Sequence, residues 1–281
     1  MLLESGGFNH CVRAREGYVV YNRNDIYIGR AIESYGEYAE IEAQLLRQLC
    51  PVGGSVIEVG ANIGTHTLVL AKAVGTSGSV IAFEPQRVVF QTLCANLALN
   101  SLTQVDARHA AVGTSTGWVG IPEIDYSLIA NYGGLEIGTF AAGTPVRLAR
   151  LDEEFTGARL DLVKVDVEGM EREVLLGAQG LLSRFRPLLY VENDRIDRSE
   201  ALIGMLLAQE YRLYWHLPPL FNPDNFFANP ANLYPGIVSV NMLAIPRERT
   251  QNVTGLSEIR DPSEHPFKRA DAQSPQSRGD E

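Results

Sequence analysis

Strand and helix patterns alternate along most of this chain, from Ser55 to about Ile245. Short runs rich in Val, Ile and Leu are bounded by turn residues, and most of them precede a stretch with helical periodicity. Strands that are apolar on both faces and alternate with helices are typical of a parallel sheet covered on both sides. The expected strands are SVIEVG, SVIAFEP, VDARHAAV, LDLVKVDVEG and LLYVEN, and the expected helices span 66–74, 88–100, 170–182 and 199–209.

The two ends of the chain depart from this alternation. Residues 12–30 alternate around an Asn-Arg-Asn-Asp turn, which predicts a hairpin, and a helix should follow over 36–49. Late in the chain, YRLYWHL and IVSVNMLAIP flank an insertion too poor in helix for a parallel crossover, so they should form an antiparallel pair at the edge. We therefore expect an N-terminal extension over 1–50, a main α/β domain over 51–246, and a mobile tail over 247–281.

Composition excludes several classes of function. The 281 residues are 45% apolar with a formal net charge of −10 and no Lys or Arg cluster, which favours a globular protein that does not bind nucleic acid. The chain has no run of about 18 apolar residues and begins without a signal-peptide pattern, so we expect a soluble cytoplasmic protein with no membrane partner. Cys11, Cys50 and Cys94 lack metal-ligand spacing and are expected to be free thiols.

The stretch VIEVGANIGTHTL joins the first buried strand to a helix through a glycine turn. A dinucleotide site would show G-x-G-x-x-G, which is absent here, and Glu58 at the strand end would repel a pyrophosphate but could pair with a cation. Glu84 ends the next strand 26 residues later, at the place where an acid accepts hydrogen bonds from ribose hydroxyls. A ligand with ribose and an amine but no phosphate fits S-adenosylmethionine.

The ordered blocks VIEVGANIG, VIAFEP, LDLVKVDVEGMEREVLLGA and LLYVEN resemble the FkbM family of S-adenosylmethionine-dependent methyltransferases, over about residues 12–246. The resemblance implies a class I Rossmann-like sheet, mostly parallel with an antiparallel edge strand. It also implies a cofactor site in which Glu84 binds the ribose, Pro85 and Ala110 border the adenine, and the turn holds the methionine. The residues that it assigns to the methionine end are Glu58, Gly60, Ala61, Asn62, Gly64, Thr65 and Asp166.

Methylation of a hydroxyl requires that its proton leave, so a base or a metal should lie at the carboxyl ends of the strands. The catalytic candidates are Asp166, Glu168, Glu192 and His216. Structural alternatives remain, because Glu168 lies in a stretch with capping-box spacing and a lone histidine is more often packed than catalytic. Asp166, Glu192 and Asn193 also resemble the divalent-metal site of catechol-type methyltransferases, which makes a magnesium ion a further hypothesis.

The methyl acceptor is expected to be a small molecule. Two turn-rich, aromatic stretches, 125–134 and 217–227, are the expected acceptor-site elements, and they would suit O-methylation of a sugar or a hydroxylated natural product. N-methylation and a non-catalytic cofactor-binding protein are the alternatives. A nucleotide-dependent dehydrogenase is disfavoured by the missing third glycine and by Glu58.

Overall fold

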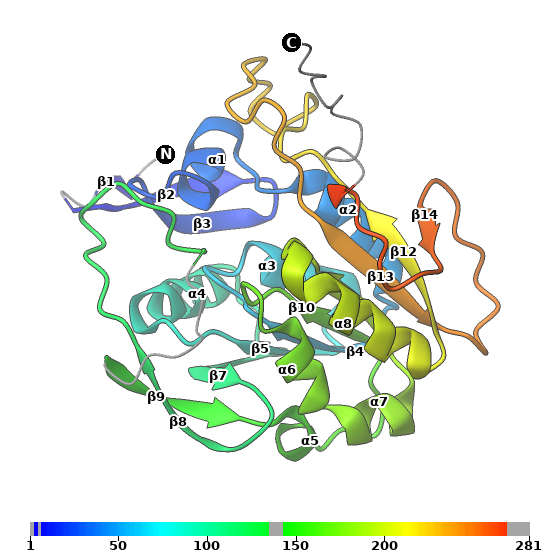
Figure 1. Cartoon of the computed structure of the whole chain (residues 1–281). Coiled ribbons are helices and arrows are strands. Elements are labelled where there is room, and N and C mark those ends of the chain that lie inside the picture. The colour runs from blue at the N-terminus through cyan, green and yellow to red at the C-terminus, as the bar shows by residue number, and fades with distance from the viewer. Residues whose placement is uncertain (1–2, 5–6, 135–142, 269–281) are drawn as a thin grey trace, which may run out of the picture.

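The computed structural model describes residues 3–4, 7–134 and 143–268, and a single large sheet runs through its centre (Figure 1). Its strand order is β14-β12-β13-β11-β10-β4-β5-β6. The five strands from β11 to β6 pair in parallel, whereas β13, β12 and β14 pair antiparallel at the other edge, as the sequence predicted. The strands are β4 (Ser55–Val59), β5 (Ser79–Phe83), β6 (Val105–Arg108), β10 (Leu162–Val165), β11 (Leu188–Glu192), β12 (Tyr211–His216), β13 (Asn241–Pro246) and β14 (Ser257–Ile259).

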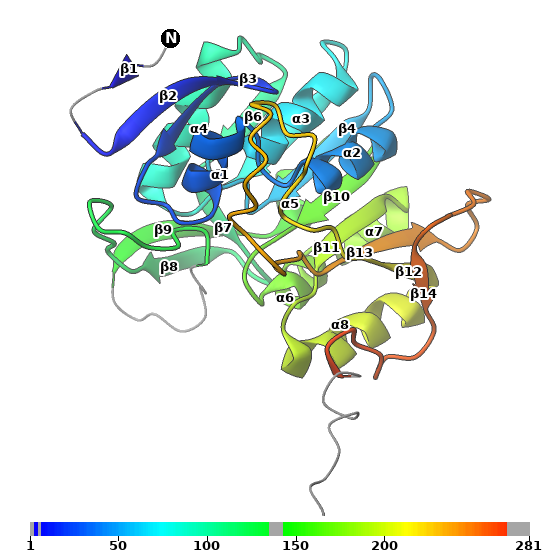
Figure 2. The same cartoon turned by 90° about the horizontal axis from the view of Figure 1, so that it is seen from above.

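Helices cover both faces of this sheet (Figures 1 and 2). Successive strand residues point to opposite faces, so Val56 packs in the cluster that contains α2 and α3, and Ile57 packs in the cluster that contains α6 and α8. This arrangement explains why the central strands are apolar at nearly every position. One face carries α2 (Glu40–Leu49), α3 (Thr65–Val74) and α4 (Arg87–Leu99), and the other carries α5 (Leu151–Glu154), α6 (Glu171–Leu176), α7 (Gln179–Phe185) and α8 (Ile196–Ala208).

The N-terminal extension contains a small antiparallel sheet and a helix that the sequence placed incorrectly. β1 (Leu3–Glu4), β2 (Asn9–Ala14) and β3 (Gly17–Asn22) form the sheet, and α1 (Ile28–Tyr35) follows it. The hairpin turn lies at Arg15 and Glu16, and Asn22–Asp25 instead lead into α1, so the predicted turn position is wrong. The predicted helix 36–49 is also shorter, because Gly36 ends α1 with φ 68° and α2 begins only at Glu40.

Two elements in the middle of the chain, each predicted as continuous, are divided into two in the structure. VDARHAAV divides at His109 into β6 and β7 (Ala110–Val112), and β7 joins a second sheet with β8 (Gly117–Ile121) and β9 (Thr144–Ala149). The predicted helix 170–182 is divided between α6 and α7. A Cβ at Gly177, between them, would lie 2.1 Å from the carbonyl oxygen of Gly113, so this junction depends on a close backbone approach.

The insertion over 217–240 lies beside the N-terminal extension (Figure 2) and is tied to it by the carboxylate of Glu37. Glu37 accepts hydrogen bonds from Arg15 Nε at 2.6 Å, from Asn222 Nδ2 at 2.8 Å and from the backbone N–H of Phe226 at 2.8 Å. Tyr234 packs against Tyr35 in the same region. Two segments almost two hundred residues apart in sequence therefore form one layer above the carboxyl ends of the strands.

Part of the predicted mobile tail has a defined position in the fold. It includes β14, which pairs with β12 through Leu213 and Ile259, and it includes His265, whose side chain is buried. Ile259 belongs to the hydrophobic core. The last part of that prediction, 269–281, lies outside the described residues. Among the helices described, none combines the length and the apolar character needed to span a membrane.

Candidate functional site

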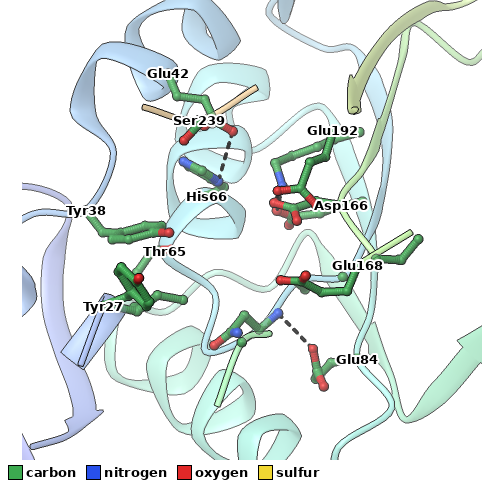
Figure 3. Close-up of a pocket in the computed structure, with 18 of the residues that line it drawn as sticks. Tyr27, Tyr38, Glu42, Thr65, His66, Glu84, Asp166, Glu168, Glu192 and Ser239 are labelled. Carbon is green, nitrogen blue, oxygen red and sulfur yellow. Dashed lines mark hydrogen bonds and ion pairs between the residues drawn. The ribbon is translucent and has the colours of Figure 1, made fainter. Parts of the chain in front are cut away.

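A cavity opens at the carboxyl ends of β4, β5, β10 and β11, and we refer to it as the sheet-edge cavity (Figure 3). Elements from all parts of the fold contribute to it, including α1, α2 and α3 on one side and the start of β13 on another. Most of the site residues expected from the sequence line it: Glu58, Gly60, Ala61, Asn62, Thr65, Glu84, Pro85, Asp166, Glu168 and Glu192.

The glycine turn after β4 forms the floor of the sheet-edge cavity. Gly60 has φ 84°, and a Cβ built on it would lie 1.7 Å from the carbonyl oxygen of Asp166. The N–H groups of Gly60 and Ala61 both donate to the carbonyl oxygen of Phe83, at 3.0 and 2.9 Å. The turn therefore packs closely between the ends of the two neighbouring strands, β5 and β10, and only glycine fits at its first position.

Gly64 has a different place from the one expected. It precedes the first residue of α3 with φ 90°, and a Cβ there would lie 2.6 Å from Leu93 Cδ1. Gly64 therefore permits close packing between α3 and α4, and it is not among the residues that line the sheet-edge cavity.

Glu84 is held by the backbone on two sides. Its Oε2 accepts the N–H of Asn62 at 2.9 Å and its Oε1 accepts the N–H of Gln86 at 2.8 Å, so each oxygen keeps one lone pair for a ligand hydroxyl. Burial raises the pKa of Glu84 to about 7, against the lowering effect of these two donors. The carboxyl group has a fixed orientation with its remaining acceptor capacity toward the sheet-edge cavity, where Figure 3 shows it beside the turn.

An adjoining apolar cavity contains Ala110. It shares Gly60, Pro85 and Val167 with the sheet-edge cavity and is completed by the side chains of β7, β8 and β9 and by Met170. Its lining is almost entirely apolar, which suits a flat aromatic ring rather than a charged group. The predicted adenine neighbours Pro85 and Ala110 therefore lie together at this apolar end.

A buried lysine lies beneath the polar end of the sheet-edge cavity. Lys164 Nζ is 2.9 Å from Asp166 Oδ2 and 4.0 Å from Glu58 Oε1, and Glu58 Oε2 accepts the hydroxyl of Thr67 at 2.6 Å. Lys164 and Glu58 are neighbours in the β10–β4 register, so they share one face of the sheet. Burial raises the pKa of Glu58 to about 7, and Lys164 only partly offsets that rise.

Asp166 and Glu192, from adjacent strands, form an unequal carboxyl pair. Burial acts to raise the pKa of Asp166, but the charge of Lys164 and hydrogen bonds from Lys164 and Glu192 bring it below its usual range. Burial and the neighbouring Asp166 charge raise the pKa of Glu192 well above its usual range. Asp166 therefore loses its proton at a lower pH than Glu192 does. Glu192 Oε2 has no hydrogen-bond partner among the described residues.

The predicted magnesium set is not assembled. Asn193 points away from the sheet-edge cavity and donates through Nδ2 to Ser199 Oγ at 2.9 Å. Within the described residues, oxygens of Glu168, Glu192 and Asp194 do lie within 4.8 Å of one another. However, Arg195 already supplies a positive charge there, with Nη2 at 2.8 Å from Glu168 Oε2.

Glu168 is the most strained residue of the candidate set. It has φ 56°, a conformation that is costly for a side chain other than glycine, and it precedes Gly169 at φ 96°. Burial, together with the charges of Asp166 and Asp194, raises the pKa of Glu168 to about 7 despite Arg195. Its carboxyl group pairs with Arg195 and lines the sheet-edge cavity, opposite Tyr27 in Figure 3.

His216 lies outside this site, contrary to the sequence-based expectation. Its Nδ1 is 2.7 Å from the hydroxyl of Tyr190, and its side chain lines a separate groove between α2 and the segment after β13. Burial lowers the pKa of His216. Alternation along β12 explains the error, because a strand-end residue can face either way and the sequence does not fix which neighbour it meets.

Sequence analysis did not identify several residues of the cavity wall. Glu42 on α2 accepts Asn241 Nδ2 at 3.2 Å and lies 3.7 Å from His66 Nδ1. Burial raises the pKa of Glu42 to about 7 and lowers that of His66 to about 3. The available signal was a charged residue on the apolar face of a predicted helix. The other unforeseen lining residues include Tyr27, Tyr38, Gln86 and Ser239.

The two expected acceptor-site stretches differ in whether they line the sheet-edge cavity. Asn131 and Gly133, from 125–134, line the sheet-edge cavity, and Gln86 fixes this stretch by donating to the carbonyl oxygen of Tyr132 at 2.9 Å. Within the insertion over 217–240, only Ser239 lines the cavity, and it lies after the predicted stretch 217–227. Residues 217–227 instead cover the N-terminal extension.

The sheet is parallel at its centre and has an antiparallel pair at its edge. A glycine turn follows its first central strand and an acid follows the next one. Together these features define the class I methyltransferase fold. A family model, the methyltransferase FkbM domain, matches residues 58–213, which is more than half of the chain. The chain belongs to the FkbM methyltransferase family.

Individual relatives are more distant. The chain is 32% identical over 171 residues to the hexuronic acid methyltransferase AglP of Haloferax volcanii, covering 60% of this chain and 67% of that protein. It is 41% identical over 61 residues to the tRNA (adenine(58)-N(1))-methyltransferase catalytic subunit TRM61 of Cryptococcus neoformans, but this spans 22% of the chain and only 14% of that protein. A solved FkbM methyltransferase from Methylobacillus flagellatus aligns with a TM-score of 0.47 at 16% identity, over 73% of this chain and 50% of that one.

Proposed function

We propose that this protein transfers the methyl group of S-adenosylmethionine to a hydroxyl of a neutral, polyhydroxylated small molecule, such as a sugar or a hydroxylated natural product. The observation that carries the proposal is the position of Glu84. Two backbone N–H groups hold its carboxylate beside the Gly60 turn and next to the apolar cavity at Ala110. Ribose at Glu84, adenine against Ala110 and methionine over the turn would use each of these features.

The charge of the sheet-edge cavity supports a neutral acceptor. Its described lining residues carry six carboxyl groups and two basic side chains, Lys164 and His66. Lys164 is already bound to Asp166, and His66 is neutral near pH 7. An anionic acceptor such as a uronate would be repelled. An amine would be attracted but held in its protonated form, which has no electron pair for the methyl group. The carboxyl groups are Glu42, Glu58, Glu84, Asp166, Glu168 and Glu192.

The proposed chemistry is an in-line displacement. The hydroxyl oxygen forms the new bond to the methyl carbon, the bonding pair of the broken S–C bond stays on sulfur, and the hydroxyl proton goes to a carboxylate. Asp166 has the lower pKa of its pair with Glu192 and ionises first as the pH rises, so we assign it as the group that accepts that proton. Much of the acceleration would come from holding the acceptor in line, an effect worth up to about 7–11 kcal/mol.

The experiment is a transfer assay with methyl-labelled S-adenosylmethionine and matched acceptors. A set of neutral glycosides, the corresponding uronic acids and the corresponding amino sugars would be compared at pH 7.5. We expect label on neutral glycosides or hydroxylated natural products at oxygen. Transfer to uronates alone would overturn the neutral acceptor, transfer to amines would replace O- by N-methylation, and cofactor binding without any transfer would favour a non-catalytic cofactor-binding protein.

A further inference from the structure

We propose that the sheet-edge cavity selects the methyl donor over the spent cofactor by charge, with Glu42 and Glu58 releasing protons when the sulfonium cofactor binds and retaining them when the neutral thioether binds. This inference rests on the proposed function, because it assumes that S-adenosylmethionine is the donor. It concerns a property that the fold alone does not imply, namely how the ratio of donor affinity to product affinity depends on pH.

Three carboxyl groups from different elements converge on one space. Glu58 lies on β4, Glu84 follows β5 and Glu42 lies on α2, and each is at least nine-tenths buried while still lining the sheet-edge cavity. Figure 3 shows Glu42 and Glu84 at opposite ends of the cavity. A cofactor with its neutral ribose at Glu84 would extend from there toward Glu58 and Glu42, so these two groups would meet its charged part.

Few positive charges balance these acids before a ligand arrives. Lys164 is bonded to Asp166 at 2.9 Å and is more distant from Glu58, at 4.0 Å, whose Oε1 has no hydrogen-bond partner in the described structure. His66, beside Glu42, is neutral near pH 7 because burial lowers its pKa to about 3. The remaining groups that face the space are the phenols of Tyr27 and Tyr38 and the acids Asp166, Glu168 and Glu192, the second of which pairs with Arg195.

The direction in which pH changes donor affinity follows from the protonation of the protein without ligand. Burial raises the pKa of Glu42 and of Glu58 to about 7, so a fraction of each carries a proton at neutral pH. A positive charge within about 4–6 Å lowers a carboxyl pKa by roughly 1–3 units and expels that proton. Donor affinity must then rise as pH increases through 7, and it levels off once the groups are ionised in the empty protein.

S-adenosylhomocysteine provides the natural comparison, because it lacks only the methyl group and the sulfonium charge. Its sulfur is neutral, so its binding displaces fewer protons and its affinity depends less on pH. The transfer step itself turns the sulfonium into a thioether, which removes the charge that had kept the carboxyl groups ionised. The product complex is therefore weakened relative to the donor complex as the pH rises.

Calorimetric titration of the full chain tests this inference. S-adenosylmethionine, S-adenosylhomocysteine and sinefungin, which carries an ammonium at the sulfonium position, would be titrated at pH 6, 7 and 8 in two buffers of different ionisation enthalpy. We expect the first and third ligands to release about one proton more than the second, and the ratio of product to donor Kd to rise about tenfold from pH 6 to pH 8. Equal proton release by all three, with a constant Kd ratio, would overturn the proposal while leaving donor binding intact.

Two amide variants separate the cavity from the rest of the surface. Glu42→Gln keeps the shape and the acceptor for Asn241 but removes one titrating group, so the proton release and the change in the Kd ratio should both fall. Glu200→Gln is the control, because Glu200 is an exposed acid on α8 and should behave as the wild type does. A Glu42→Gln protein with the full pH dependence would remove Glu42 from the proposal. Failure of every ligand to bind the wild type would instead overturn the proposed function, and this inference with it.

Discussion

The two ends of the sheet-edge cavity are built by different means. At the end proposed to bind the ribose, Glu84 and the Gly60 turn are fixed by backbone hydrogen bonds and close backbone packing. At the other end, Asp166, Glu168 and Glu192 interact mainly with other titratable side chains, and one Glu192 oxygen has no hydrogen-bond partner within the described part of the chain. The first end can bind a ligand without a change in its conformation, whereas the carboxyl groups of the second end can exchange protons with a ligand. Substitutions should therefore divide into those that abolish binding and those that abolish turnover.

The largest expected effect is at the turn. Gly60→Ala places a Cβ against the carbonyl oxygen of Asp166, and we expect a loss of roughly 4 kcal/mol or more in cofactor binding, about a thousandfold in Kd. Gly255→Ala is the matched control, because Gly255 has φ 79° and open space around its Cβ position. Titration with S-adenosylhomocysteine and thermal unfolding check both variants. A folded Gly60→Ala protein with native affinity would place the cofactor elsewhere.

The next effect should fall on turnover and not on binding. Asp166→Asn removes the member of the carboxyl pair that has the lower pKa, and we expect kcat to fall by roughly 10²–10⁴-fold at saturating donor. Glu192→Gln can still donate a hydrogen bond to Asp166 through its amide, so its kcat should fall by only about tenfold. The reverse order of the two variants would make Glu192 the base.

A moderate effect on binding is expected at the ribose end. Glu84→Gln leaves one backbone N–H facing an amide NH₂, and it removes the charge that accepts the ribose hydroxyls. We expect the Kd for S-adenosylhomocysteine to rise by about 1.5–3 kcal/mol, or roughly 10–150-fold. Calorimetry measures this directly. An unchanged Kd would show that the ribose does not contact Glu84.

The smallest effect on activity should be at His216, which lies outside both ends. His216→Ala removes the hydrogen bond between His216 Nδ1 and the Tyr190 hydroxyl, so we expect a stability loss of about 1–3 kcal/mol, with kcat and Kd within about twofold of the wild type. Thermal unfolding and steady-state assays separate these quantities. A large fall in kcat with native cofactor binding would return His216 to the catalytic candidates.

Sequence patterns predicted the sheet well for a physical reason. The central strands are buried on both faces, so their apolar runs are continuous, and the helices between them show clear periodicity. The errors occur where backbone conformation depends on distant partners. Gly36, where the predicted helix was to begin, instead ends α1, and a Cβ there would lie 2.8 Å from ring atoms of Phe226 and Phe227. Gly177 divides a helix because it packs on Gly113. These partners are all distant in sequence.

The site was predictable to the extent that it lies on strand ends. Glu58, Gly60 and Glu84 follow directly from the rule that ligands bind at the carboxyl ends of parallel strands. Glu42 and Asn241 reach the sheet-edge cavity only because α2 packs beside β13, which no local pattern encodes. His216 was misplaced for the same reason, since the face of an edge strand depends on its neighbours.

The hydrogen bonds at Glu37 have a consequence for biosynthesis. Asn222 and Phe226 emerge from the ribosome long after Glu37, and until then Glu37 has only Arg15 of the three hydrogen-bond donors described above. Contacts between residues so far apart also form slowly, because a long loop must close first. A nascent chain that already has its glycine turn and Glu84 would still lack a finished cavity, so cofactor capture should await the synthesis of β13.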